Sequence, residues 1–149
     1  MKTKQILNQL LADLHQMLTL TYQVHWYMRG ERFLVLHPML DSYIEEYQSY
    51  IDEVAELLIM QGGAPYSTLQ ELANHSKLEI TKGDYELSIS EQLEKLLSGL
   101  EYMDAEFNKV IKIADEEGTQ SIVDAIQGMK SATEKHLWMI KAELGRPVK

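Results

Sequence analysis

The sequence predicts an all-α protein: a four-helix bundle forming one domain over residues 1–149. Apolar residues recur every three or four positions along four long segments, which is the helical period. Glycine or Gly–Pro stops separate those segments, and no useful stretch alternates with the period of a β-strand. The 149 residues, 45% of them hydrophobic, suffice for a single core that needs no covalent staple.

Two long helices are predicted in the N-terminal half. The first covers residues from about 4 to 29 and stops near Gly30. The second begins at Phe33, after a turn over residues 30–32, and runs for about 30 residues. It ends at residues 62–65, Gly-Gly-Ala-Pro, because glycine takes the left-handed capping conformation and proline cannot continue the helical hydrogen bonds.

The next segment, residues 65–87, loses this period and is predicted to be a long crossover. Ser67 with Gln70 forms a capping-box pattern that predicts a short helix to about Asn74. Ser88 with Glu91 is a second capping box.

The second box begins a third long helix that lasts until Gly118, and a fourth covers residues 119–144 before a glycine and a proline. One long connection between two short ones makes the second and third helices parallel, which is the ferritin-like arrangement of a four-helix bundle.

The composition excludes several classes of function. With no cysteine, the chain has no disulfides, thiolate metal sites or cysteine nucleophile. A net charge of -9 disfavours nucleic acid as a partner and favours small cations. No apolar run is long enough to span a membrane, and Asp13 and His15 lie where a signal peptide would be apolar. We therefore expect a soluble, cytoplasmic protein.

Candidate metal ligands lie on the second helix. His37 and Asp41 are four residues apart, as are Asp52 and Glu56, so each pair lies on one side of the helix, away from the apolar stripe. Asp41 and Asp52 are separated by about 16 Å along the axis, too far to bind one metal centre in one chain. Antiparallel packing of two copies across a two-fold axis would join the pairs into two identical sites.

His25, on the first helix, lies about as far from the intervening turn as His37 does, so an antiparallel hairpin can bring the two imidazoles together. Imidazoles and carboxylates without thiolates suit iron(II) or zinc. The alternative is that these residues are a packed histidine and solvated carboxylates, which are commoner, and the spacing alone leaves the two interpretations about equal.

The motif His25-Trp26-x-x-x-Gly30-x-x-Phe33-x-x-x-His37-x-x-x-Asp41 resembles the Dps family of mini-ferritins. The resemblance continues through Asp52-x-x-x-Glu56 and Gly62-Gly63-x-Pro65, and more loosely through Asp124 and Glu134-Lys135-x-x-Trp138, so it covers nearly the whole chain. It implies a hollow dodecamer that oxidises iron(II) with hydrogen peroxide, two irons per peroxide, stores the ferric mineral and protects against oxidative stress. It also implies ferroxidase centres at two-fold interfaces.

The resemblance also assigns roles to single residues. One subunit would supply His25, His37 and Asp41, and its neighbour Asp52 and Glu56. Trp26 matches an aromatic that can supply an electron near the centre, although a core or interface packing role fits it equally well.

The same resemblance places Asp124 in a three-fold iron-entry pore, with residues 115–117 nearby. A capping role through Ser121-x-x-Asp124 is the alternative for that aspartate. Glu45, Glu46 and Glu53 are candidate sites for ferric nucleation.

Two other functions stay open from the sequence. DNA-binding members of the family often carry a lysine-rich tail, whereas here only Lys2 and Lys4 are basic at the start of the chain, so weak DNA binding is expected. A structural dodecamer with a vestigial centre is the third possibility. His15, His75 and His136 have no matching carboxylates and are interpreted as structural or surface residues. No Glu-x-x-His occurs, which disfavours a di-iron site inside one subunit.

Overall fold

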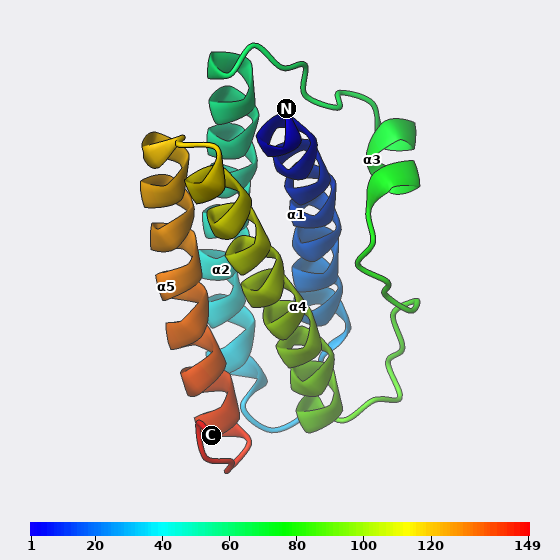
Figure 1. The fold of residues 1–149 in the computed structure, drawn as a ribbon. Coiled ribbons are helices and arrows are strands. Elements are labelled where there is room, and N and C mark those ends of the chain that lie inside the picture. The colour runs from blue at the N-terminus through cyan, green and yellow to red at the C-terminus, as the bar shows by residue number, and fades with distance from the viewer.

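The computed structural model describes residues 1–149 and contains five helices and no strand. They are α1 (Lys2–Tyr27), α2 (Phe33–Met60), α3 (Leu69–His75), α4 (Ile89–Glu116) and α5 (Gln120–Glu143). The four long helices form a bundle, and the connection carrying α3 runs along its side, so that α2 and α4 are parallel (Figure 1). The predicted ferritin-like four-helix bundle is confirmed. None of the helices combines the length and hydropathy needed to span a lipid bilayer.

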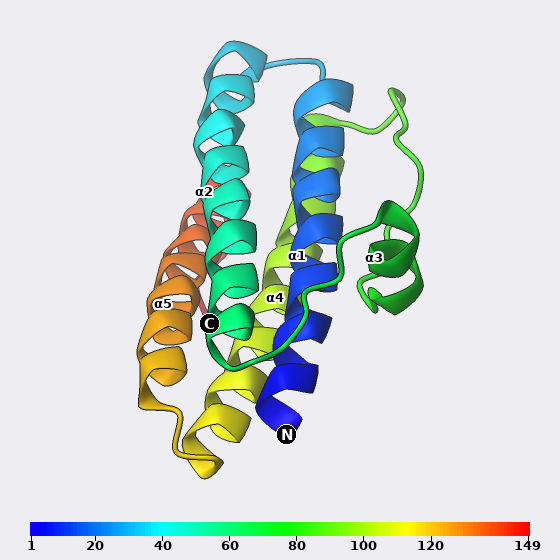
Figure 2. The same ribbon diagram turned by 90° about the horizontal axis from the view of Figure 1, so that it is seen from above.

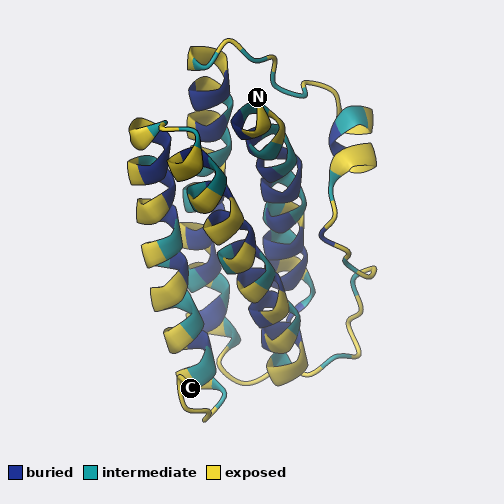
Figure 3. Cartoon of the chain, in the orientation of Figure 1, coloured by how far each residue is buried: buried dark blue, intermediate teal, exposed yellow.

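Helix α1 is the central element of the core. It packs against α2, α4 and α3, and all of its leucines except the partly buried Leu18 are buried, as are the inward faces of all four long helices (Figure 3). Gly99 of α4 lies at the α1 contact, where a Cβ atom would come within 2.5 Å of Leu20 Cδ2 and 2.8 Å of Met17 Sδ. The missing side chain therefore allows α4 to approach α1 closely.

A buried carboxylate fixes the crossover to the bundle. Asp13, in the middle of α1, is fully buried. It accepts hydrogen bonds from Lys77 N at 2.7 Å, Leu78 N at 3.2 Å, Ser76 Oγ at 3.0 Å and Tyr102 Oη at 3.0 Å. These bonds compensate the cost of burying the charge and hold the crossover with α3 beside α1 (Figure 2).

The predicted start of the short helix was wrong by one residue. Thr68, not Ser67, caps α3, and its capping-box partner is Glu71 rather than Gln70. The Glu71 carboxylate accepts hydrogen bonds from the backbone N–H groups of both Ser67 and Thr68. An ionised carboxylate makes stronger hydrogen bonds than the neutral amide oxygen of Gln70 would make, which favours Glu71 as the partner. The box that begins α4 at Ser88 is confirmed.

Candidate metal centre

Two histidines meet where α1 ends and α2 begins. The His25 and His37 rings stack with their centroids 3.7 Å apart and an interplanar angle of 7°. His25 Nδ1 lies 2.8 Å from the His37 carbonyl oxygen, and His37 Nδ1 lies 2.9 Å from the His25 carbonyl oxygen. The predicted proximity of the two imidazoles is confirmed.

The ends of the two helices explain why this pair forms. Carbonyl groups in the last turn of a helix have no N–H partner within the helix. The Nδ1–H group of the His37 ring supplies that partner to the carbonyl oxygen of His25, in the last turn of α1. Phe33, one turn before His37, stacks on the His37 ring with centroids 4.7 Å apart. The α1–α2 hairpin and the orientation of both imidazoles therefore depend on the same contacts.

This hydrogen bonding fixes which ring nitrogen of each neutral imidazole is free. A carbonyl oxygen can only accept, so each Nδ1 carries the hydrogen and each Nε2 keeps its lone pair. Asp41 is exposed, and its Oδ1 lies 3.4 Å from His25 Nε2. Two Nε2 atoms and one carboxylate are thus available near one end of α2, in the tautomers that metal-binding histidines require.

The other carboxylate pair lies further along α2. Asp52 and Glu56 are both exposed, and Asp52 raises the pKa of Glu56 through a hydrogen bond and through charge repulsion. A bound cation would remove that repulsion. Within one chain no three His, Asp or Glu side chains are arranged to hold a metal ion. Each chain therefore carries two separate partial sets of candidate ligands.

Trp26, beside His25, is not a core residue. Its side chain is 61% exposed and stacks on Tyr22, with ring centroids 5.1 Å apart. Gln48 of α2 donates to the Tyr22 hydroxyl at 3.0 Å, which ties this aromatic pair to the second helix. Core packing is therefore the wrong interpretation of Trp26. The two other interpretations, an oxidisable aromatic residue and a residue of an interface between subunits, stay predictions.

The capping interpretation of Asp124 is also wrong. Thr119 is the N-cap of α5, and Ser121 lies inside the helix. Asp124 is exposed beyond the first turn, and its Oδ1 accepts from Gln120 Nε2 at 3.0 Å. The nearby Glu117 is bound to the start of α1, where it accepts from the Thr3 backbone N–H at 2.8 Å, so it is not free to line a pore.

One interaction between α2 and α5 has no signature in the sequence. His136 of α5 is half-buried, and its Nε2 lies 2.6 Å from Glu46 Oε2 of α2. The Tyr43 ring lies 4.0 Å from the His136 ring, and the Tyr50 hydroxyl donates to Glu46. Glu46 is therefore engaged by neighbours, unlike the exposed Glu45. No spacing within one helix signals this contact between helices.

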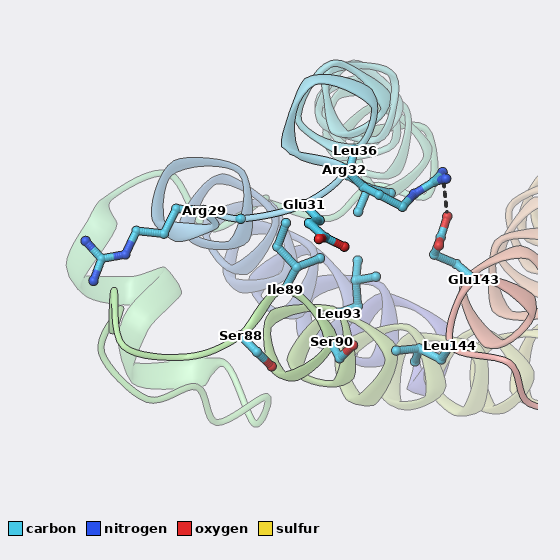
Figure 4. Close-up of a pocket in the computed structure, with 11 residues that line it drawn as sticks. Arg29, Glu31, Arg32, Leu36, Ser88, Ile89, Ser90, Leu93, Glu143 and Leu144 are labelled. Carbon is cyan, nitrogen blue, oxygen red and sulfur yellow. Dashed lines mark ion pairs between the residues drawn. The ribbon is translucent and has the colours of Figure 1, made fainter.

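A cavity of about 340 Å³ lies at the end of the bundle where the α1–α2 turn meets α4 and α5 (Figure 4). Its arginines are paired: Arg32 contacts Glu143 at 2.9 Å, and Arg29 contacts Glu86 at 3.1 Å. None of the candidate metal ligands lines it. The cavity therefore does not compete with the histidine cluster as the functional site.

Comparison with known proteins identifies the family. A family model described as a ferritin-like domain matches residues 4–147. A Streptococcus suis protein named DNA protection during starvation protein is 44% identical over 147 residues, covering 99% of this chain and 86% of that protein. The chain belongs to the Dps family of ferritin-like proteins.

Solved Dps structures agree in fold. The X-ray structure of Dps from Listeria monocytogenes has a TM-score of 0.95 at 35% identity, covering 98% of this chain and 95% of that one. A structure of Dps from Listeria innocua soaked with 10 mM zinc has a TM-score of 0.93 at 35% identity, covering 98% of each chain. At this identity and coverage the Dps fold extends over the whole bundle.

Proposed function

We propose that this Dps protein is a ferroxidase and iron-storage protein, with iron(II) as substrate and hydrogen peroxide as oxidant. The observation that carries the proposal is the stacked His25–His37 pair, whose Nδ1 atoms are hydrogen-bonded and whose Nε2 atoms keep their lone pairs, with Asp41 Oδ1 3.4 Å from His25 Nε2. A histidine pair that served only to join α1 to α2 would need no carboxylate 3.4 Å from its free nitrogen.

The centre is completed by a second copy of the chain. Two α2 helices packed antiparallel across a two-fold axis bring His37 and Asp41 of one copy to Asp52 and Glu56 of the other. The five ligands of each centre are then His25, His37, Asp41, and Asp52 and Glu56 of the second copy. Nitrogen and oxygen donors of this kind bind iron(II) and also zinc, so zinc competes for the site.

The chemistry needs two electrons for each peroxide. Two iron(II) ions each give up one electron, and the peroxide leaves as two waters after taking up two protons. Because both electrons arrive at one centre, no hydroxyl radical is released. Trp26, exposed beside His25, can supply an electron to trap a radical formed near the centre. Iron(II) enters a dodecamer through a pore lined by Asp124. The ferric product is stored inside the dodecamer, where the mineral nucleates at Glu45 and Glu53.

The test is an iron oxidation assay on the metal-free assembled protein. Iron(II) is added anaerobically, then peroxide at half the iron concentration, and ferric absorbance is followed together with a hydroxyl-radical trap. We expect fast oxidation, one peroxide consumed per two irons and no trapped radical. Oxidation no faster than in buffer would refute the proposal and leave a dodecamer with a vestigial centre.

DNA protection by direct binding is the second candidate, since the curated relatives are named DNA protection during starvation protein. The charge argues against it: at -9 per chain, a dodecamer would carry on the order of a hundred negative charges. Removal of iron(II) and peroxide protects DNA without contact. A band-shift assay over a range of salt concentrations separates the two, because direct phosphate contacts give a steep loss of affinity with salt.

A further inference from the structure

A cluster of tyrosines around a carboxylate lies where α2 meets α5. Glu46 lies at its centre, with Oε1 accepting from the Tyr50 hydroxyl and Oε2 lying 2.6 Å from His136 Nε2. Tyr47, which is 2% exposed, lies edge-on to Tyr50 with ring centroids 5.9 Å apart. Phe107 of α4 also lies edge-on to Tyr50, at 6.4 Å. None of these residues is among the five proposed ligands of the ferroxidase centre.

The hydrogen bonds assign the protons in this cluster. Burial raises the pKa of Glu46, but the hydrogen bonds from His136 and Tyr50 outweigh it, and the pKa lies below its ordinary value. The Tyr50 phenol therefore donates its proton in a hydrogen bond to a carboxylate that favours the ionised form.

We propose that Tyr50 is a one-electron donor whose phenolic proton passes to Glu46 when the ring is oxidised. Oxidation of a half-buried phenol without a base would leave a positive charge in the bundle, which is costly. Transfer along the existing hydrogen bond gives a neutral tyrosyl radical and a neutral carboxylic acid instead. The aromatic rings of Tyr47 and Phe107 shield the radical from solvent.

The oxidant rests on the proposed function: it is hydrogen peroxide at a centre that holds a single iron(II). One electron comes from that iron and one from Tyr50, the peroxide takes two protons from solvent to become two waters, and the phenolic proton stays on Glu46. A second iron(II) later reduces the radical, and Glu46 returns the proton. Tyr50 precedes the proposed ligand Asp52 by two residues, about 3 Å of axial rise and about 200° of rotation, so the electron would cross α2 from its inner to its outer side.

The experiment is electron paramagnetic resonance on the assembled protein, frozen within milliseconds of mixing. The protein carries ring-deuterated tyrosine and less than one iron(II) per centre before peroxide is added. We expect a radical signal narrowed by deuteration, reduced at least five-fold in Tyr50→Phe and also reduced in Glu46→Gln. Tyr50→Phe keeps the ring contacts, so loss of the signal would not reflect lost packing.

Tyr102→Phe is the matched control. The Tyr102 hydroxyl also donates to a carboxylate, Asp13, at 3.0 Å, but Asp13 lies about 18 Å along α1 from His25. The signal should persist in this variant. An equal tyrosyl signal in Tyr50→Phe, or a signal that deuterated tyrosine does not narrow, would overturn the proposal.

Failure of the tyrosine proposal is distinguishable from failure of the ferroxidase. Normal two-iron oxidation without a radical that depends on Tyr50 refutes only the tyrosine proposal. If iron is not oxidised, a photogenerated one-electron oxidant, ruthenium tris-bipyridyl with persulfate, replaces iron and peroxide in the same variants. A radical lost in Tyr50→Phe but kept in Tyr102→Phe then supports the site, and an equal signal in both refutes it.

Discussion

A centre shared between two copies predicts a specific result when two inactive variants are assembled together. His37→Ala removes a ligand from the histidine end of α2, and Glu56→Ala removes one from the carboxylate end. The two ends are about 16 Å apart when measured from Asp41 to Asp52, so no centre can use both ends of one chain. Each variant alone should lose ferroxidase activity.

The expected recovery follows from two-fold symmetry. In a mixed dimer, one centre combines both defects, and the other combines the intact histidine end of one copy with the intact carboxylate end of the other. With equal amounts and random pairing, half of the dimers are mixed, so about 25% of all centres are intact. A centre built within one chain predicts none.

A reciprocal mixture gives the control. Wild-type chains co-assembled with the double variant His37→Ala/Glu56→Ala should also give about 25% intact centres if they are shared, but about half if each chain builds its own. The chains are refolded together so that they exchange, and initial rates of ferric absorbance are compared at equal protein concentration. Recoveries near zero and one half in the two mixtures would refute the shared centre.

Three further predictions concern stability and iron entry. Hydrogen bonds from Thr3 lower the pKa of Glu117, so the stabilisation that its ionised carboxylate gives the fold should be complete above pH 4.5, the ordinary pKa, and should be lost as the pH falls through the lower folded value. The free energies of urea unfolding of Glu117→Gln and wild type should therefore converge in acid. A difference that stays constant with pH would contradict this. Asp13→Ala leaves several buried donors unpaired and should cost about 3 kcal/mol or more of unfolding free energy, with faster hydrogen exchange at the Leu78 amide; protected exchange would count against an anchored crossover. Asp124→Asn should slow iron uptake several-fold while leaving radical formation at preloaded centres unchanged, and an unchanged uptake rate would exclude it from the pore.

The sequence was sufficient for the helices because their stops are local. Gly–Pro endings and the Ser88 capping box depend on residues a few positions apart, and the apolar period depends only on helical geometry. The proximity of His25 and His37 could be predicted for the same reason, since a short turn joins the two helices. The predicted start of α3 was displaced by one residue because Gln70 and Glu71 both have side chains that can accept a hydrogen bond from the backbone N–H group of an N-cap residue three positions earlier.

The remaining interactions could not be read from spacing because they join distant segments. Asp13 meets Leu78 across 65 positions and Glu46 meets His136 across 90, and neither pair has a periodic signature. Packing angles and side-chain rotamers decide such contacts once the bundle has formed. For this reason His136 looked like an isolated surface or structural histidine in the sequence.

In the proposed arrangement, splitting the ligands between two chains makes oxidation depend on assembly. A single chain presents three ligands at one end of α2 and two at the other, and one chain brings no three of the candidate groups into a metal-binding arrangement. Strong iron binding then appears only when two copies pair, which is also the step that begins to enclose a storage cavity. Ferric iron is therefore produced where it can be stored, and unassembled subunits do not generate it in free solution. The hybrid recovery of about 25% measures this dependence directly.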